Sequence, residues 1–390
     1  DGTVRSGLFL IFFCYPFYVS GSEMMWQLST SVGGTHYENI SLLENPEDSE
    51  SKISKRIIGL LEYSTPKASI TAKPSIANTT FSDSTRNTTD IGLQLSTNYR
   101  TQKIDFQFST DTQRDSSFTS EETTTGFLDK KIRRKTDQYS PALTVVIDSL
   151  STVSFSHSFT DIDYLNGRNA GLFDYEYKNN SISYNRLTDS LGTIGITVSK
   201  LSQDVTQLQS KYDTKIIQVG LSKDYSQTFS YSANIGLRRY SNSIGYADYS
   251  VSDKGWIMDL SGSKQFASSR VNLSAKREVS PSGGGYMILR DQIAFDYKYQ
   301  FSEQLTYSFY ATAFKNTRET ESEELKRYYG SADFGITYNF APRWNISFNY
   351  QIRKNHSEEM VPGKDNMVKF MLSYSGPKTP VKYYGNNTDF

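Results

Sequence analysis

The stretch YQFSEQLTYSFYA, from Tyr299 to Ala311, places large apolar side chains at every second position on both sides of a short polar break. A period of two puts these side chains on one face of a β-strand and their polar neighbours on the other face. The break at Ser302–Gln304 predicts the turn of a β-hairpin. The chain as a whole is hydrophilic, with a mean hydropathy of −0.55, so the fold depends on which solvent the aromatic face meets.

The same alternation continues on both sides of this hairpin. Apolar residues alternate with polar ones from Ile293 to Phe301, from Phe334 to Phe340 and from Trp344 to Ile352. Such runs are roughly 10 to 15 residues long, whereas strands of soluble proteins are usually about 5 to 6 and tilted membrane-spanning strands need about 9 to 11. The chain contains 28 Tyr and 23 Phe, and this abundance of aromatic residues favours strands over helices.

Short turns alternate along the chain with long polar loops, which is the layout of an outer-membrane barrel whose short turns are periplasmic. The short turns are DSLST (148–152), TDSLGT (188–193), DYSQT (224–228), QFASSR (265–270), QFSEQL (300–305) and NFAPRW (339–344). We therefore predict an all-β fold, a transmembrane antiparallel up-and-down β-barrel of about 18 strands (roughly 16–18). The predicted strands are 24–37, 53–64, 67–77, 90–99, 102–111, 137–147, 151–161, 172–186, 190–201, 212–223, 227–241, 252–265, 268–278, 287–300, 304–318, 326–339, 343–356 and 364–375.

The beginning of the sequence predicts export. The apolar run LFLIFFCYPFYV (Leu8–Val19) follows Arg5 and precedes small residues at Ser20–Ser22, the pattern of a secretory signal peptide. We expect a signal peptide at 1–22, a barrel at 23–375 and a periplasmic tail at 376–390, where two prolines should interrupt strand pairing. A secreted β-sandwich would also alternate, but the long strands, the aromatics near turns and the export signal favour a barrel in the bacterial outer membrane.

A barrel in lipid predicts the direction of each face. Charged residues facing lipid at the midplane cost about 2 to 4 kcal/mol each, so the charged side of each strand should face a hydrated lumen. The predicted lumen-facing residues are Asp259, Lys276, Glu278, Arg290, Asp296, Lys298, Asp333, Arg353 and Lys369. The predicted aromatic girdle at the periplasmic interface consists of Tyr299, Phe301, Tyr307, Phe340 and Trp344.

The sequence contains no convincing catalytic, metal-binding or cofactor-binding constellation, so we expect no enzyme activity, metal or cofactor. His157 in FSHSF has serines beside it, but adjacent residues in a strand point to opposite faces and cannot form a catalytic pair. Equal numbers of basic and acidic residues, 42 each, argue against a nucleic-acid partner. The acidic segment 44–50 and the basic segment 129–135 are expected to be solvated loops, with lipid phosphates or an anionic glycan as an alternative partner for the basic one.

At YQFSEQLTYSFYATAF and REVSPSGGGYMILRDQIAFDYKY the chain resembles the β-barrel porin 2 family of outer-membrane proteins, which are often associated with exopolysaccharide production. The similar features are the Tyr-rich strand, the short periplasmic turn and the PSGGG loop (Pro281–Gly285), which we expect to be a flexible loop tip; the resemblance covers most of 137–375. It implies a porin-like passive conduit for small polar solutes or exopolysaccharide. The alternative is a structural barrel that scaffolds an exopolysaccharide secretion system without conducting. Expected partners are outer-membrane lipid and lipopolysaccharide, the barrel-insertion machinery, and exopolysaccharide or its export apparatus.

Overall fold

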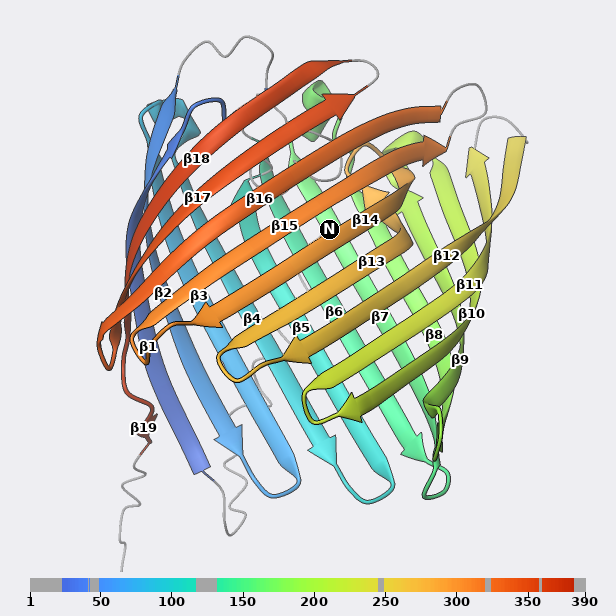
Figure 1. Cartoon of the computed structure of the whole chain (residues 1–390). Helices are drawn as coiled ribbons and strands as arrows, with labels where there is room; N and C mark the ends of the chain where they lie inside the picture. The colour runs from blue at the N-terminus through green and yellow to red at the C-terminus, as the bar shows by residue number, and fades with distance from the viewer. Residues whose placement is uncertain are drawn as a thin grey trace, which may run out of the picture.

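The computed structural model describes residues 23–40, 42, 49–116, 132–244, 249–319, 324–357 and 360–381. Long antiparallel strands wind around a barrel in sequence order (Figure 1). The strands are β1 (Glu23–Tyr37), β2 (Glu50–Ser64), β3 (Ala68–Phe81), β4 (Thr88–Arg100), β5 (Ile104–Ser116), β6 (Arg133–Val146), β7 (Ser151–Leu165), β8 (Tyr175–Thr188), β9 (Gly192–Val205), β10 (Ser210–Ser226), β11 (Phe229–Ile244), β12 (Tyr249–Gln265), β13 (Ser269–Ser282), β14 (Tyr286–Gln300), β15 (Leu305–Glu319), β16 (Glu324–Ala341), β17 (Trp344–Ser357), β18 (Met360–Ser375) and the short β19 (Thr379–Pro380). The expected signal peptide at 1–22 lies outside the described residues.

The sheet closes on itself through β1, which pairs with β2 on one side and with β18 on the other. The β1–β18 pairing extends from Ser29↔Ser375 to Tyr37↔Met367, so the eighteen long strands form a closed antiparallel barrel. Both the fold class and the predicted strand number are confirmed. Closure satisfies the backbone hydrogen bonds that an open sheet edge would leave exposed to hydrocarbon.

The two ends of the barrel differ in the length of their connections (Figure 1). The strands are 13 to 18 residues long, and tight turns join them at one end, as where the Phe301 N–H donates to the Leu305 carbonyl (2.9 Å). The short 3-10 helices η2 (Ser84–Arg86), η3 (Gly167–Ala170) and η4 (Thr206–Leu208) lie in connections at the opposite end, the long-loop end. No helix in the described ranges is long and apolar enough to cross a membrane.

The predicted strands 102–111 and 137–147 leave 112–136 as a loop, and this loop is wrong at both of its ends, because β5 continues to Ser116 and β6 already begins at Arg133. The charged residues that suggested a loop are instead neutralised across strands. Arg133 pairs with Asp90 (2.9 Å) and Arg134 with Asp115 (2.8 Å). In the basic segment 129–135, residues 133–135 are strand, Ile132 precedes the strand, and residues 129–131 lie outside the described part of the chain.

The outer surface of the barrel carries the large apolar side chains. Ile293, Phe334 and Phe370 are all exposed in the isolated chain, as lipid-facing residues must be. The residues that precede them, Gln292, Asp333 and Lys369, are polar and point to the other face. A soluble sheet would instead bury the apolar row, so the arrangement fits a hydrocarbon environment.

The predicted girdle residues meet at the short-turn end of β14–β18. The rings of Tyr299, Phe301 and Tyr307 lie 6.2 to 6.5 Å apart. Trp344 stacks on Phe340 at 6.3 Å and, in a second contact at 4.7 Å, packs on Tyr374. These exposed aromatic clusters occupy the level at which an interfacial belt is expected.

The C-terminal segment returns to the barrel after the last long strand. β18 ends at Ser375, and pairing resumes at β19, where Thr379 and Pro380 lie opposite Trp26 and Met25 of β1. The expected tail at 376–390 thus begins with a short strand, and residues 382–390 lie outside the described residues.

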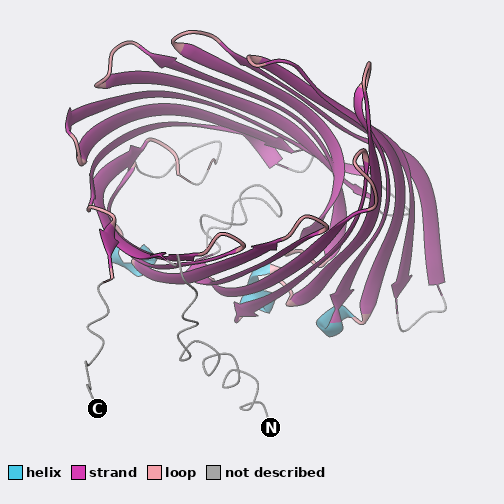
Figure 2. Ribbon diagram, turned by 90° about the horizontal axis from the view of Figure 1, so that it is seen from below, coloured by secondary structure: helices cyan, strands magenta, loops and turns pink. Residues whose placement is uncertain are grey.

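One seam of the barrel is only half paired. β12 and β13 pair from Gln265↔Arg270 to Met258↔Arg277 and not beyond, although both strands continue towards the long-loop end. Above Met258 the two strands diverge, and a gap opens between β12 and β13 (Figure 1). In Figure 2 the strands on the right, the side of β9–β12 in Figure 1, spread away from the oval ring formed by the rest of the barrel.

Candidate functional site: the barrel interior

The structure places the nine predicted polar residues on the face opposite the exposed apolar side chains. Several of them make polar contacts with one another or with neighbours across strands. Asp259 pairs with Lys276 (3.4 Å), and Asp296 accepts a hydrogen bond from Asn272 (2.8 Å). The other predicted residues also lie on the inner face, because each is an even number of residues from inner-face residues of its own strand. They are Glu278, Arg290, Lys298, Asp333, Arg353 and Lys369.

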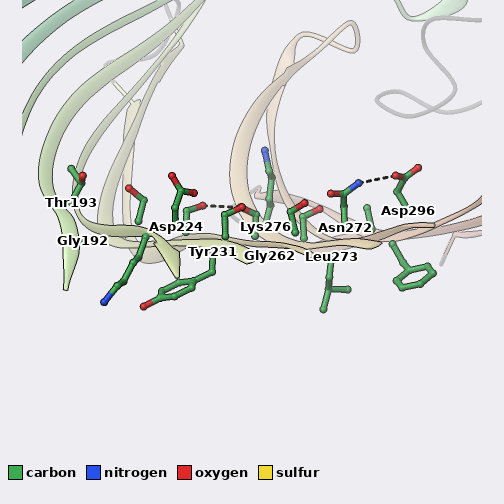
Figure 3. Close-up of a pocket in the computed structure, with 18 of the residues that line it drawn as sticks. Gly192, Thr193, Asp224, Tyr231, Gly262, Asn272, Leu273, Lys276 and Asp296 are labelled. Atoms are coloured by element: carbon green, nitrogen blue, oxygen red, sulfur yellow. Dashed lines mark hydrogen bonds between the residues drawn. The ribbon is translucent and has the colours of Figure 1, made fainter. Parts of the chain in front are cut away.

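A polar hollow of about 1000 Å³ follows the inner wall of β8–β15. Figure 3 shows Asn272, Lys276 and Asp296 projecting to one side of the sheet and Leu273 to the other. Serine, threonine and amide side chains make up most of the inner lining, and Ser232 and Ser261 lie in hydrogen-bonding contact at 2.7 Å. Such a wall offers many donors and acceptors to a hydroxylated solute.

The β13–β14 hairpin folds into the barrel at the long-loop end. Val279, Met287 and Leu289 have the strand parity of the lipid-facing residues Leu273 and Ile293, yet they are almost completely buried. They belong to one apolar cluster with inner-face residues of β7–β12, namely Tyr164, Leu201, Tyr212, Ile216, Tyr240 and Ile257. The outer face of the hairpin therefore packs against the inner face of β7–β12, which explains why β12 and β13 separate above Met258.

The turn of this hairpin is held by hydrogen bonds from the β7–β8 connection and from β9. The Phe173 N–H donates to the Gly283 carbonyl (2.9 Å), and the Gln203 side-chain amide donates to the Ser282 carbonyl (3.3 Å). Gly283 has no room for a side chain, because a Cβ would overlap the buried Tyr164 hydroxyl. The expectation that PSGGG is a flexible loop tip is wrong: it is an anchored turn inside the barrel.

A second inward segment follows β1. The Asn39 N–H donates to Asp365 Oδ1 (2.7 Å), and Asp365 also binds Arg353 (2.6 Å) in a fully buried ion pair. Leu42 packs in a buried cluster with Phe314 and Tyr329 of the inner wall. The described residues of this segment thus pack against the inner wall at β15, β16 and β18.

Arginine side chains gather on the inner face of β14–β17 near these two segments. Arg290 lies over the Phe314 ring at 4.8 Å and donates to Asn316 (2.9 Å). Arg318 lies over the Tyr286 ring at 4.2 Å. Arg327 adds a further positive charge to this end of the interior, whereas Asp365 neutralises that of Arg353. Of these arginines, Arg290 and Arg353 are among the predicted lumen-facing residues.

The histidines take no part in the interior. The His157 ring contacts Asn180 (2.8 Å), His36 contacts Ser51 (2.9 Å) and His356 stacks on Tyr328. His36 and His356 are exposed and His157 is half-buried. Within the described ranges no three His, Cys, Asp or Glu side chains are grouped to hold a metal ion.

The lipid-face alternation of this hairpin runs through Val279, Met287 and Leu289, but Arg277 and Asp291 interrupt it at the same strand parity and pair with each other at 3.4 Å. These two charges and the glycines at 283–285 are the sequence signals that set the segment apart. Which wall the hairpin meets depends on contacts between residues more than 70 positions apart, such as Gln203 and Ser282.

No protein-family profile and no curated protein sequence matches the chain. Solved structures of outer-membrane porins match its fold. Pseudomonas aeruginosa OccK2 (OpdF) in complex with glucuronate has a TM-score of 0.53 at 10% identity and covers 90% of this chain and 98% of that chain. Pseudomonas aeruginosa OpdO has a TM-score of 0.51 at 13% identity, covering 90% and 97%, and a BenF-like porin from Pseudomonas fluorescens Pf-5 has 0.51 at 9%, covering 92% and 99%.

Proposed function

We propose that this chain is a porin-like channel of the bacterial outer membrane through which small polar solutes pass passively. The observation that carries the proposal is a polar inner wall bearing both charge signs, enclosed by an apolar outer wall in a closed barrel. A closed barrel of this strand number is wide enough to hold an aqueous path. The fold shared with outer-membrane porins supports the proposal, because that fold builds channels in them.

Small hydroxylated solutes, including sugar acids, are the substrate class that fits the interior best. Hydroxyl and amide side chains around Ser232, Ser261 and Asn272 match neutral sugar hydroxyls. At the long-loop end, Arg290 and Arg318 favour a carboxylate, which arginine binds with well-oriented donors. The glucuronate named with the OccK2 structure belongs to this chemical class.

A polysaccharide chain is the finer possibility that the family resemblance suggested. We rank it below small solutes, because the hairpin turn and the segment after β1 occupy part of the interior at the long-loop end. A non-conducting scaffold barrel is the remaining alternative. The apolar cluster around Leu172 and Val205 supports it only if that cluster seals the interior completely.

Liposome swelling tests the proposal directly. Purified protein is reconstituted into liposomes, which are diluted into isosmotic solutions of neutral sugars and sugar acids of increasing size. We expect swelling rates that fall steeply with solute size and that exceed those of protein-free liposomes. Rates equal to those of empty liposomes for every solute would contradict a conduit and favour the scaffold.

A further inference from the structure

Four basic residues form an unbroken row across the outer face of β9–β12. The row consists of Lys200, Lys215, Arg239 and Lys254. Each lies directly opposite the next in the strand register: Lys200↔Lys215, Lys215↔Arg239 and Arg239↔Lys254. Residues directly opposite in antiparallel strands share a face, so the four cations stand side by side at the strand spacing of about 4.8 Å.

This basic row carries more positive charge than its neighbours neutralise. All four side chains are exposed. Lys200 forms an ion pair with Asp213 (3.3 Å). In the described part of the chain, no ion pair is found for Lys215, Arg239 or Lys254. Like charges directly opposite one another destabilise a sheet. The described part of the chain leaves this repulsion largely uncompensated, and an external anion bound along the row would relieve it.

An apolar row lies directly beneath the basic row. It consists of Val198, Ile217, Leu237 and Trp256, which are also in mutual register and all exposed. Each is two residues from a basic residue towards the short-turn end, a step of about 6.6 Å along the strand. The basic row thus marks the boundary between the apolar belt and the long-loop end, which faces the outer leaflet in a porin orientation.

We propose that the two rows form a docking site for a phosphate-bearing lipid of the outer leaflet. The acyl chains would lie against the apolar row, and phosphate oxygens would bridge adjacent cations of the basic row. An acidic protein or a soluble anion would match the charges, but neither would cover Leu237 and Trp256. A phosphorylated lipid satisfies both rows in one molecule, and membrane-facing basic clusters attract anionic lipid.

The site is independent of the proposed conduit, because it lies on the opposite face of the wall from the lumen. It requires only that the barrel is inserted with its long loops towards the outer leaflet. Loss of lipid binding would leave conductance through the interior untouched, so the two proposals fail separately.

Native mass spectrometry of the full chain in detergent, titrated with a bisphosphorylated outer-membrane glycolipid, tests the site. Replacing Lys215 and Arg239 with Gln removes two cations from the centre of the basic row. At about 1 kcal/mol per basic residue near an anionic lipid surface, binding should weaken on the order of 30-fold. The dephosphorylated glycolipid should bind the unaltered chain with a similar loss, and inorganic phosphate alone should bind far more weakly than the lipid.

Lys55→Gln is the matched control. Lys55 is an exposed outer-face lysine of β2, but its register neighbours are Val32 and Asn78 rather than cations. Its replacement should leave lipid affinity within about two-fold of the unaltered chain, as expected for a single screened surface charge. Heat-modifiable mobility on gels shows that each variant is folded. Equal lipid affinity of the double variant and the control, or equal binding of the dephosphorylated lipid, would overturn the site.

Discussion

Replacing Gly283 with Val should release the β13–β14 hairpin from the wall that holds it. A Cβ at position 283 would overlap the Tyr164 hydroxyl and lie 3.0 Å from Leu172 Cδ2. Tyr164 and Leu172 are 6% and 1% exposed, so neither can move aside into solvent. The hairpin is the part with room to shift, because β12 and β13 are unpaired at this level.

The expected energetic effect comes from two sources. Overpacking a filled interior costs about 1 to 3 kcal/mol. Displacing the turn also breaks the hydrogen bonds to the Ser282 and Gly283 carbonyls, each worth about 0.5 to 1.5 kcal/mol. The sum, roughly 2 to 6 kcal/mol, is enough to reverse a docked state that is favoured by a similar amount, since about 5.5 kcal/mol moves an equilibrium from 1:99 to 99:1.

The assay is the exclusion limit of the channel for neutral polymers in planar bilayers. A displaced hairpin should raise both the single-channel conductance and the size of the largest polymer that enters. Gly262→Ala is the control, because a Cβ there meets no atom within 4 Å and should change neither quantity. The reasoning is refuted if folded Gly283→Val channels keep the conductance and the polymer limit of the unaltered chain.

Three further changes have defined outcomes. Asp365→Ala removes the carboxylate that binds the buried Arg353 guanidinium, so the free energy of unfolding in urea should fall by about 3 to 5 kcal/mol; an Asp365→Ala midpoint equal to that of the unaltered chain contradicts this. Replacing Arg290 and Arg318 with Gln removes positive charge from the interior and should shift the reversal potential in a salt gradient towards cation preference. The reason is that one charge acting on an ion at about 4 Å is worth about 1 kcal/mol in water. An unchanged reversal potential would place these arginines off the ion path. Trp344→Ala removes an aromatic cluster worth about 0.5 to 1.5 kcal/mol beyond its burial and should lower the temperature at which the barrel loses its heat-modifiable mobility, whereas no shift would exclude a girdle role.

Most of the fold could be predicted because each strand carries its own signal. In the hairpin around Phe301, alternation sets both the strand and its lipid face, and the Ser-Glu-Gln break sets the turn. The same local logic gave the eighteen strands with ends displaced by a few residues. It failed at Arg133 and Arg134, where a run of charge suggested a loop; their partners, Asp90 and Asp115, lie on other strands and were not recognised as such.

The shape of the interior could not be predicted, because it depends on contacts between distant segments. Met287 and Leu289 carry the lipid-face pattern, but the wall they meet is the inner face of strands about 50 to 120 residues earlier, including Tyr164 and Tyr240. The side of each strand that faces lipid follows from period two. Period two does not predict how far two neighbouring strands stay paired. The separation of β12 from β13 above Met258 decides the width of the lumen.

The central claim is that the interior is a continuous aqueous path. Single-channel recording of the purified, heat-modifiable protein in a planar lipid bilayer tests it most directly. We predict discrete, uniform conductance steps that scale with the salt concentration and persist without applied ligand. A correctly folded barrel that inserts into the bilayer and yields no steps at any voltage or salt concentration would contradict the account.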